Sequence, residues 1–143
     1  MGMFVSHVIT RLIVGGAQEN TISTVLGLHE SSDVDVELIS GPTDASLPEG
    51  SLDSKLSKIP KQFHIEPHLI RPVSLFHDFR AYISLKRRYQ ETHPDIVHTH
   101  SGKAGFIGRL AANAAGIKCI IHTIHGPSFG SYQSGLSNAF FVN

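Results

Sequence analysis

Short hydrophobic runs alternate with helical patterns along most of the chain. The runs that predict strands cover residues 4–10, 34–40, 63–66, 95–99 and 118–123. Apolar positions at three- and four-residue spacing predict helices over residues 17–29, 52–59, 75–92 and 103–115. This alternation is typical of βαβ units, so we expect an α/β fold: a Rossmann-like parallel sheet with helices on both faces.

The first predicted strand leads through Gly15 and Gly16 into a polar helix start. Glycine lets the backbone approach a ligand without a Cβ in the way, and the N-terminus of a helix attracts anions. The sequence therefore predicts a phosphate or sugar pocket near these two glycines. The alternative is a tight turn in which glycine supplies a positive φ.

Four histidines lie near the ends of the last two predicted strands. Residues two apart in a strand point the same way, so His98 and His100 should share one face of the sheet, while His122 should point away from His125. Histidines gathered at a sheet edge would suit zinc. No cysteine supplies a further ligand and Asp95 is the only nearby carboxylate, so we expect no metal site. A metal-dependent hydrolase that uses the four histidines is kept as an alternative.

The helix predicted over residues 103–115 is rich in small side chains, which would let it pack closely on the sheet. Ser101 stands where an N-cap is expected. Gly102 and Lys103 do not form a Walker loop, because Val97 stands where the first glycine should be and Ala104 replaces the Ser or Thr. The sequence therefore gives no support to ATP hydrolysis.

The helix predicted over residues 75–92 has an aromatic and a basic side. We expect four residues to face inward: Phe79, Tyr82, Ile83 and Tyr89. Four cations should face solvent: Arg80, Lys86, Arg87 and Arg88. Such a helix can lie on anionic lipid, whereas the acids at Asp78 and Glu91 favour an ordinary solvated surface.

Composition narrows the classes of function. The 143 residues are 41% apolar and 17% charged, which suits a globular domain with its own core. Twelve basic and twelve acidic residues leave no net charge, so we expect no nucleic-acid partner. No apolar run approaches the roughly 20 residues of a membrane span, and Arg11 interrupts any signal peptide. The single cysteine, Cys119, lies in an apolar run, where we expect it to be buried, and fits a cytoplasmic protein.

Residues 134–143 begin a helical pattern that is still apolar at Phe140 and Phe141. A helix that stops there leaves its hydrophobic face without neighbours. We therefore expect residues 1–143 to be a truncated piece of a longer protein.

Four segments, in this order, carry a resemblance to a known family. They are VITRLIVGGAQ at residues 8–18, PDIVHTHS at 94–101, GRLAA at 108–112 and HTIHG at 122–126. Together they resemble the amino-terminal domain of a GT-B, GT4-like retaining glycosyltransferase of glycosyltransferase family 4, group 1.

The resemblance implies two Rossmann-like domains facing each other across a cleft. This chain would be the acceptor-side domain, and the carboxyl-terminal domain that holds most of the donor would be absent. The intact enzyme would transfer a sugar, with retention and without a cofactor, from a nucleoside-diphosphate sugar to a polysaccharide, lipid-linked or small-molecule glycan acceptor. Such an enzyme would serve cell-envelope polysaccharide synthesis in the cytoplasm or at the inner face of the membrane. The chain alone would be inactive.

The same resemblance assigns roles to single residues. Gly15 and Gly16 match the glycine-rich loop that approaches the donor phosphates, and His125 matches a histidine that contacts the transferred sugar or the reaction centre. We expect His100, Ser101 and Gly126 to line the acceptor side of the cleft. A non-catalytic Rossmann-like binding module is the second alternative.

Overall fold

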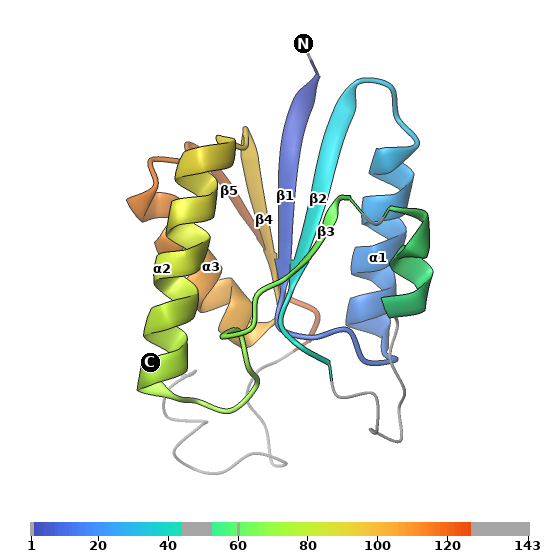
Figure 1. Cartoon of the computed structure of the whole chain (residues 1–143). Coiled ribbons are helices and arrows are strands. Elements are labelled where there is room, and N and C mark those ends of the chain that lie inside the picture. The colour runs from blue at the N-terminus through green and yellow to red at the C-terminus, as the bar shows by residue number, and fades with distance from the viewer. Residues whose placement is uncertain (1, 44–52, 60, 127–143) are drawn as a thin grey trace.

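The computed structural model describes residues 2–43, 53–59 and 61–126, which form a parallel sheet with helices on both faces (Figure 1). The strands are β1 (Met3–Ile9), β2 (Val34–Ser40), β3 (Phe63–Ile65), β4 (Ile96–His100) and β5 (Cys119–Thr123). The helices are α1 (Gly16–His29), the 3-10 helix η1 (Asp53–Lys58), α2 (Leu75–Thr92) and α3 (Gly102–Ala114). The predicted α/β, Rossmann-like fold is confirmed.

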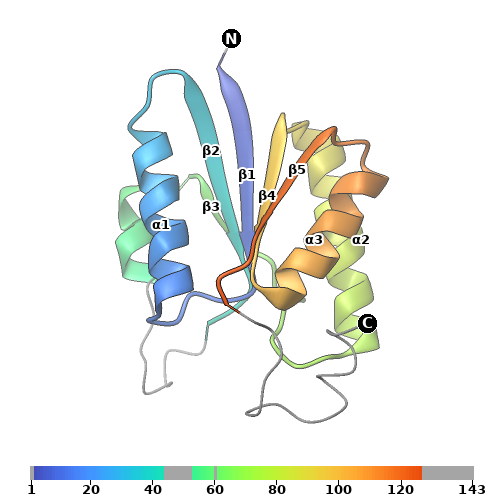
Figure 2. The same cartoon turned by 180° about the vertical axis from the view of Figure 1, so that it is seen from behind.

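The described strands lie in the order β3-β2-β1-β4-β5, and each neighbouring pair is parallel. Strand β1 is central, with Val5 opposite Val36 of β2 and Ile96 of β4. All carboxyl ends therefore meet at one edge of the sheet, the lower edge in Figure 2, where α1 and α3 also begin. Sites in parallel α/β sheets form at this edge.

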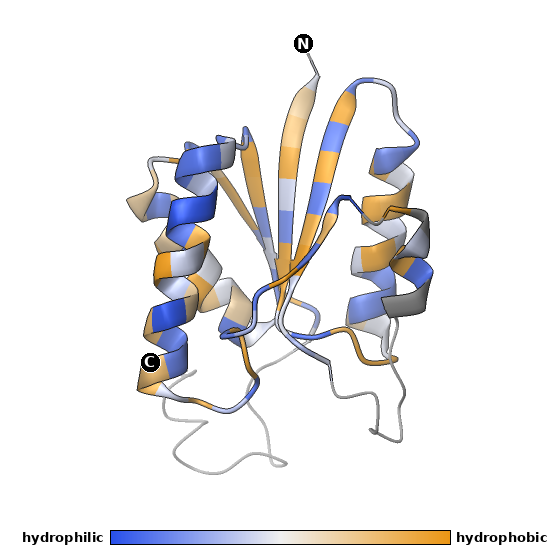
Figure 3. Ribbon diagram, viewed as in Figure 1, coloured by the Kyte–Doolittle hydropathy of each residue, from blue (hydrophilic) through white to orange (hydrophobic). Residues whose placement is uncertain are grey.

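Two hydrophobic clusters hold the layers together. On one face of the sheet, Ile9 and Leu38 pack with Ile22 and other residues of α1. On the other face, Val8 and its neighbours pack with α2 and α3. Figure 3 shows hydrophobic bands along the central strands, crossed by hydrophilic bands in β1 and β2. The buried polar residues of these two strands include Ser6, His7 and Glu37.

The buried carboxylate of Glu37 lies on the face covered by α2. It accepts a hydrogen bond from the Ser6 hydroxyl at 2.6 Å and one from Nε of Arg88 at 3.0 Å. Arg88 therefore points inward and does not face solvent as predicted. Because a buried charge must be paired to be tolerated, this ion pair secures α2 against β2.

Helix α2 has the predicted bounds but a different inner face. Ala81, Leu85 and Tyr89 are buried, whereas Phe79 and Ile83 are 64% and 45% exposed. The buried residues follow a four-residue spacing along one side of the helix. Phe79 and Ile83 are each two positions from Ala81, which places them about 200° around the helix, on the opposite side. The prediction that Phe79 and Ile83 face inward is therefore wrong. None of the described helices is long and apolar enough to cross a membrane.

Cys119 is exposed, so the prediction of a buried cysteine is wrong. Strand β5 is the last strand of the described sheet, and Ile121, which points to the same face, is also exposed. Among the described elements, no helix covers this face of β5 (Figure 2). The pattern of hydrophobic residues was the same as in a covered strand, so it could not reveal the difference.

The remaining boundary predictions hold to within a residue or two where they can be compared. The helix predicted over residues 52–59 is instead the 3-10 helix η1, which the structure describes as Asp53–Lys58. Most of the loop predicted over residues 41–54, and all of the helix start predicted over 134–143, lie outside the described residues.

The small residues of α3 bring the helix close to the sheet, as predicted. A Cβ added at Gly108 would lie 2.9 Å from Cγ1 of Val8 and 3.0 Å from Cγ2 of Thr99. Real Cβ atoms rarely approach so closely in a well-packed interior. Even one methyl group at this position would push α3 away from β1 and β4.

Gly108→Ala should therefore lower the free energy of unfolding by about 1–3 kcal/mol, the usual effect of overpacking a core. Gly27→Ala is the matched control, because nothing lies within 4 Å of a Cβ at that helical glycine. The control should raise stability by up to about 1 kcal/mol, since alanine favours helix. Urea unfolding of both variants measures the difference, and equal stability would contradict the close packing.

Candidate functional site

The first part of the candidate site is the start of α1. Gly15 occupies the N-cap position with φ 170° and ψ 156°, an extended backbone, so the alternative of a positive-φ turn is wrong. Nothing lies within 4 Å of a Cβ built at Gly16, the first residue of the helix. The first N–H groups of a helix lack partners inside it. Gly16 thus borders open space beside main-chain donors, whereas a Cβ at Gly15 would lie 2.9 Å from Oε1 of Gln18.

The second part links the ends of β1 and β4. Ser101 stands at the N-cap of α3 as predicted, but its side chain makes no capping hydrogen bond. Thr10 takes that role, since its Oγ1 accepts a hydrogen bond from the Ala104 N–H at 3.1 Å. Ser101 Oγ lies 2.8 Å from Thr10 Oγ1. Ser101 has φ 66° and ψ 163°, a region that costs a residue other than glycine about 1–3 kcal/mol.

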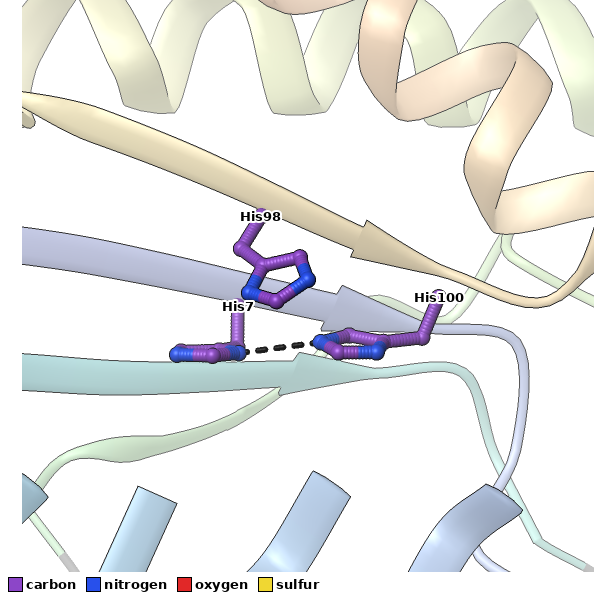
Figure 4. A group of neighbouring side chains, drawn as sticks. All are labelled: His7, His98 and His100. Atoms are coloured by element: carbon purple, nitrogen blue, oxygen red, sulfur yellow. Dashed lines mark hydrogen bonds between the residues drawn. The ribbon is translucent and has the colours of Figure 1, made fainter. Parts of the chain in front are cut away.

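The third part is a group of histidines on the sheet face that α1 covers in part. His98 and His100 share this face, as predicted, and His7 of β1 lies between them and β2 (Figure 4). His7 and His98 are direct partners in the parallel register. Sequence reasoning missed His7. The available signal was a second polar residue inside the buried run of residues 5–9.

Two hydrogen bonds join three of these rings in series. His7 Nδ1 lies 3.0 Å from His100 Nε2, and His100 Nδ1 lies 3.1 Å from His125 Nε2. His98 is engaged elsewhere, with its Nε2 2.7 Å from Thr123 Oγ1. The structure therefore brings His125 together with His100, and Gly126 follows with φ 150° at an exposed position.

His122 lies on the opposite face, as predicted. Its Nδ1 is 2.9 Å from the Thr99 hydroxyl, and its ring fills the space that a Cβ at Gly105 would need. The four histidines considered as zinc ligands are thus divided between two faces, which separates His122 from the other three. Lys103, beside the rejected Walker pattern, bonds the carbonyl oxygen of Ile70 at 2.9 Å.

Burial makes the inner histidines hard to protonate. The pKa of His7 is lowered to about 3, mainly by loss of hydration on burial and secondly by the neighbouring His98. The same two causes lower the pKa of His100 to about 2. Burial also lowers the pKa values of His98 and His122. These four imidazoles are therefore neutral at pH 7 and act as hydrogen-bonding groups.

Three histidines lie close enough to share a cation. One ligand nitrogen from each of His7, His98 and His100 lies within 4.8 Å of the others, and within the described residues this group includes no carboxylate. Three neutral imidazoles can hold zinc when a fourth position stays open. Both nitrogens of His100 are, however, already hydrogen-bonded to other rings.

A hollow of about 390 Å³ lies elsewhere, between β3 and α2. Its lining includes Glu66 and Arg88. The Glu66 carboxylate accepts a hydrogen bond from the His68 N–H at 3.0 Å, and Arg88 is paired with Glu37. Glu66 is thus hydrogen-bonded and Arg88 is ion-paired within the fold. The lining of this hollow contains none of the predicted site residues.

A family model described as Glycosyltransferase Family 4 matches residues 14–141. The chain belongs to glycosyltransferase family 4. It is 43% identical over 82 residues to the UDP-Gal:alpha-D-GlcNAc-diphosphoundecaprenol alpha-1,3-galactosyltransferase of Escherichia coli, a match that covers 57% of this chain and 21% of that protein. The predicted resemblance is confirmed.

Solved structures of nucleotide-sugar enzymes share the fold of this family 4 chain. A UDP-N-acetylglucosamine 2-epimerase superposes with a TM-score of 0.65 and 20% identity, covering 99% of this chain and 39% of that one. The apo form of the lipopolysaccharide outer core galactosyltransferase WaaB superposes with a TM-score of 0.61 and 15% identity, and the match covers 84% of this chain and 32% of that one. The chain thus spans about a fifth to two fifths of the length of these relatives.

The lowered pKa values of His7 and His100 predict that acid destabilises the fold. Below the ordinary histidine pKa of 6.5 the unfolded chain takes up protons that these two folded residues refuse until about pH 3 and 2. The free energy of unfolding should therefore fall as the pH drops through 6.5, by up to about 1.4 kcal/mol per pH unit for each histidine. Urea unfolding between about pH 7 and 5 measures the slope.

His7→Gln removes one of the two groups and should make that slope shallower. His29→Gln, a change at an exposed position on α1, is the matched control and should keep the wild-type slope. Equal slopes in wild type and His7→Gln would show that His7 is protonated as easily in the folded chain as in the unfolded one.

Proposed function

We propose that this chain is the amino-terminal, acceptor-side domain of a retaining glycosyltransferase. The intact enzyme transfers a sugar from a nucleoside-diphosphate sugar to an acceptor hydroxyl. The observation that carries the proposal is the common edge of the sheet: Gly15 and Gly16 follow β1, and His125 follows β5, whose carboxyl end lies at the same edge. Family membership supports the reaction class.

In the proposed reaction the acceptor oxygen bonds to the anomeric carbon as the bond from that carbon to the diphosphate breaks, and the acceptor hydroxyl gives its proton to an oxygen of the departing diphosphate. The diphosphate leaves with the electron pair and gains negative charge. Main-chain N–H groups at the start of α1 stabilise that charge without rearranging, because they are held in place by the helix. His125 hydrogen-bonds the transferred sugar and orients it. We assign no general base to this chain.

The names of the relatives support a choice of donor and acceptor for the proposed enzyme. The Escherichia coli relative and the epimerase are both named for UDP-linked sugars, which supports a uridine diphosphate donor here. The acceptor of the first relative is a diphosphoundecaprenol-linked sugar, which supports a lipid-linked glycan acceptor. A role in cell-envelope polysaccharide synthesis at the cytoplasmic face of the membrane agrees with both.

The exposed side of α2 supports contact with a membrane surface. Phe76 is 65% exposed, and Phe79 and Ile83 are exposed as well. Arg80 lies 5.8 Å above the ring of Phe76, so a cation accompanies the apolar side chains. Both acids that argued against lipid are paired within the fold, Asp78 with Lys103 and Glu91 with Arg87. The proposed enzyme therefore rests α2 on anionic lipid.

His125→Ala in an enzyme that joins this chain to a donor-binding domain should lower kcat by about 100-fold, because one oriented hydrogen bond to the sugar is lost. Release of uridine diphosphate, measured with and without a lipid-linked acceptor, follows the reaction. Residues 1–143 alone should show no turnover. His29→Ala, a change at an exposed position of α1, should keep wild-type kcat.

Each alternative function predicts a different result in the same assay. A binding module would release no diphosphate under any condition. A metal-dependent hydrolase would release it without acceptor and would lose that activity to a chelator. Unchanged kcat in His125→Ala, with normal acceptor-dependent release, would remove His125 from the proposed site.

Phe76→Ser combined with Phe79→Ser should reduce co-sedimentation of the chain with anionic vesicles by about tenfold, since two large apolar side chains would no longer be buried in lipid. Met3→Ser, at an exposed position far along β1 from the carboxyl edge, is the control and should bind as wild type does. Equal binding of all three proteins would contradict membrane contact through α2.

A further inference from the structure

A chain of hydrogen bonds runs from the interior of the sheet to its carboxyl edge. It begins at His7, which is 1% exposed, passes through His100, which is 2% exposed, and ends at the half-buried His125. The ring planes of His7 and His100 lie within 12° of each other with their centres 5.3 Å apart, and those of His100 and His125 lie within 29° with their centres 5.4 Å apart. Each pair therefore meets edge to edge, as an in-plane hydrogen bond between ring nitrogens requires. Figure 4 shows the inner bond, between His7 and His100.

The middle residue couples the two outer ones. A neutral imidazole carries one N–H donor and one bare nitrogen acceptor. His100 uses both nitrogens, so it must donate to one neighbour and accept from the other. The three rings must then share one tautomer: either every proton is on Nδ1 or every proton is on Nε2. The tautomer of His125 is therefore set by that of His100.

The buried end decides between the two arrangements. His7 Nε2 is buried and has no hydrogen-bond partner among the described residues. If the protons were on Nε2, a buried N–H donor would be left without an acceptor, an arrangement that folded proteins rarely contain. With the protons on Nδ1, His7 donates to His100, His100 donates to His125, and only a lone pair is left unpaired.

We propose that His7 and His100 are positioning residues that hold the ring of His125 and fix its proton on Nδ1. This inference rests on the proposed function, in which His125 orients the transferred sugar. The Nδ1–H group is the one left over for a sugar oxygen, because Nε2 is occupied by His100. A ring held in one orientation and one tautomer loses no freedom when the sugar binds.

The neighbouring histidine shows why proximity alone is not enough. The His98 ring centre is 4.2 Å from that of His100, closer than the ring centres of His7 and His125 are. His98 Nε2 nevertheless pairs with the Thr123 hydroxyl and not with His100. His98 therefore supplies a matched control on the same strand and the same face. The low pKa values of His7 and His100 agree with a series of neutral rings.

The test reads the protonation of each imidazole nitrogen by ¹⁵N NMR of the 143-residue chain, at about pH 8, where ordinary imidazoles are neutral. In wild type, His7, His100 and His125 should all carry the proton on Nδ1. His100→Leu removes the donor to His125, which should then shift toward the Nε2–H form that imidazole side chains favour in water. His98→Leu should leave His125 unchanged.

His7→Leu is a second variant. It breaks the hydrogen-bonded series at His7 and leaves His100, the residue bonded to His125, in place. It should allow His100, and with it His125, to exchange between tautomers. Identical nitrogen signals of His125 in wild type, His100→Leu and His7→Leu would overturn the proposal. So would a change of the His100 signals on adding a chelator to the wild-type chain, since the group would then hold a metal.

A kinetic measurement separates this inference from the proposed function. In the two-domain enzyme, His100→Leu should lower kcat by about tenfold with little change in the donor KM, because the sugar still binds but is less well oriented. If the wild-type enzyme transfers no sugar while the tautomers are as expected, the proposed function is wrong and the positioning of His125 stands. An unchanged kcat with a shifted tautomer would overturn the positioning role.

Discussion

The parallel pairing of β1 with β2 on one side and β4 on the other is the constraint on which the rest of the structure depends. It places the ends of these strands, and therefore the candidate site, at one edge. The main chain there is packed without side chains between the segments. A Cβ at Gly41, directly after β2, would lie 1.8 Å from the Leu69 carbonyl oxygen and 2.4 Å from that of Thr10. The edge is therefore shaped by backbone contacts that no substitution at Gly41 can preserve.

The two faces of the sheet treat buried polar groups differently. Ser6 and His7 are consecutive in β1 and so point to opposite faces. The face of Ser6 holds a charge, the Glu37 carboxylate, matched by Arg88. The face of His7 holds imidazoles without an acid in the group, which stay neutral because burial lowers their pKa values. One face thus uses an ion pair to fix a helix, and the other uses hydrogen bonds to connect the interior with the edge.

Much of the fold could be predicted because it depends on local patterns. Parallel strands are buried on both faces and give continuous apolar runs, and α2 was predicted with its observed bounds. The inner face of α2 could not be predicted from apolar spacing, because two apolar stripes competed. The structure buries the stripe of Ala81, Leu85 and Tyr89, on the side where Arg88 pairs with Glu37. Cys119 was misplaced because burial depends on which elements cover a strand.

The candidate site was predictable in its location and less so in its contacts. Parallel topology brings Gly15, Ser101 and His125 to a common edge, which could be predicted from their places after predicted strands. Their roles in the site came from the family resemblance and stay predictions. Contacts that depend on register could not. His7 joins the group only because it stands opposite His98, and Thr10 replaces the Ser101 side chain as the cap of α3 only because β1 ends beside it.

Because the histidine group is neutral, charge stabilisation and sugar orientation fall to different groups in the proposed enzyme. A protonated His100 would be opposed by burial and by His98, so it cannot supply positive charge to a departing diphosphate. Stabilisation of that charge therefore falls to main-chain N–H groups, at the start of α1 and in the donor-binding domain, while the imidazoles fix the position of the sugar. Separating charge stabilisation from orientation lets each be held rigidly: the first by a helix, and the second by a hydrogen-bonded series whose far end is buried in the sheet.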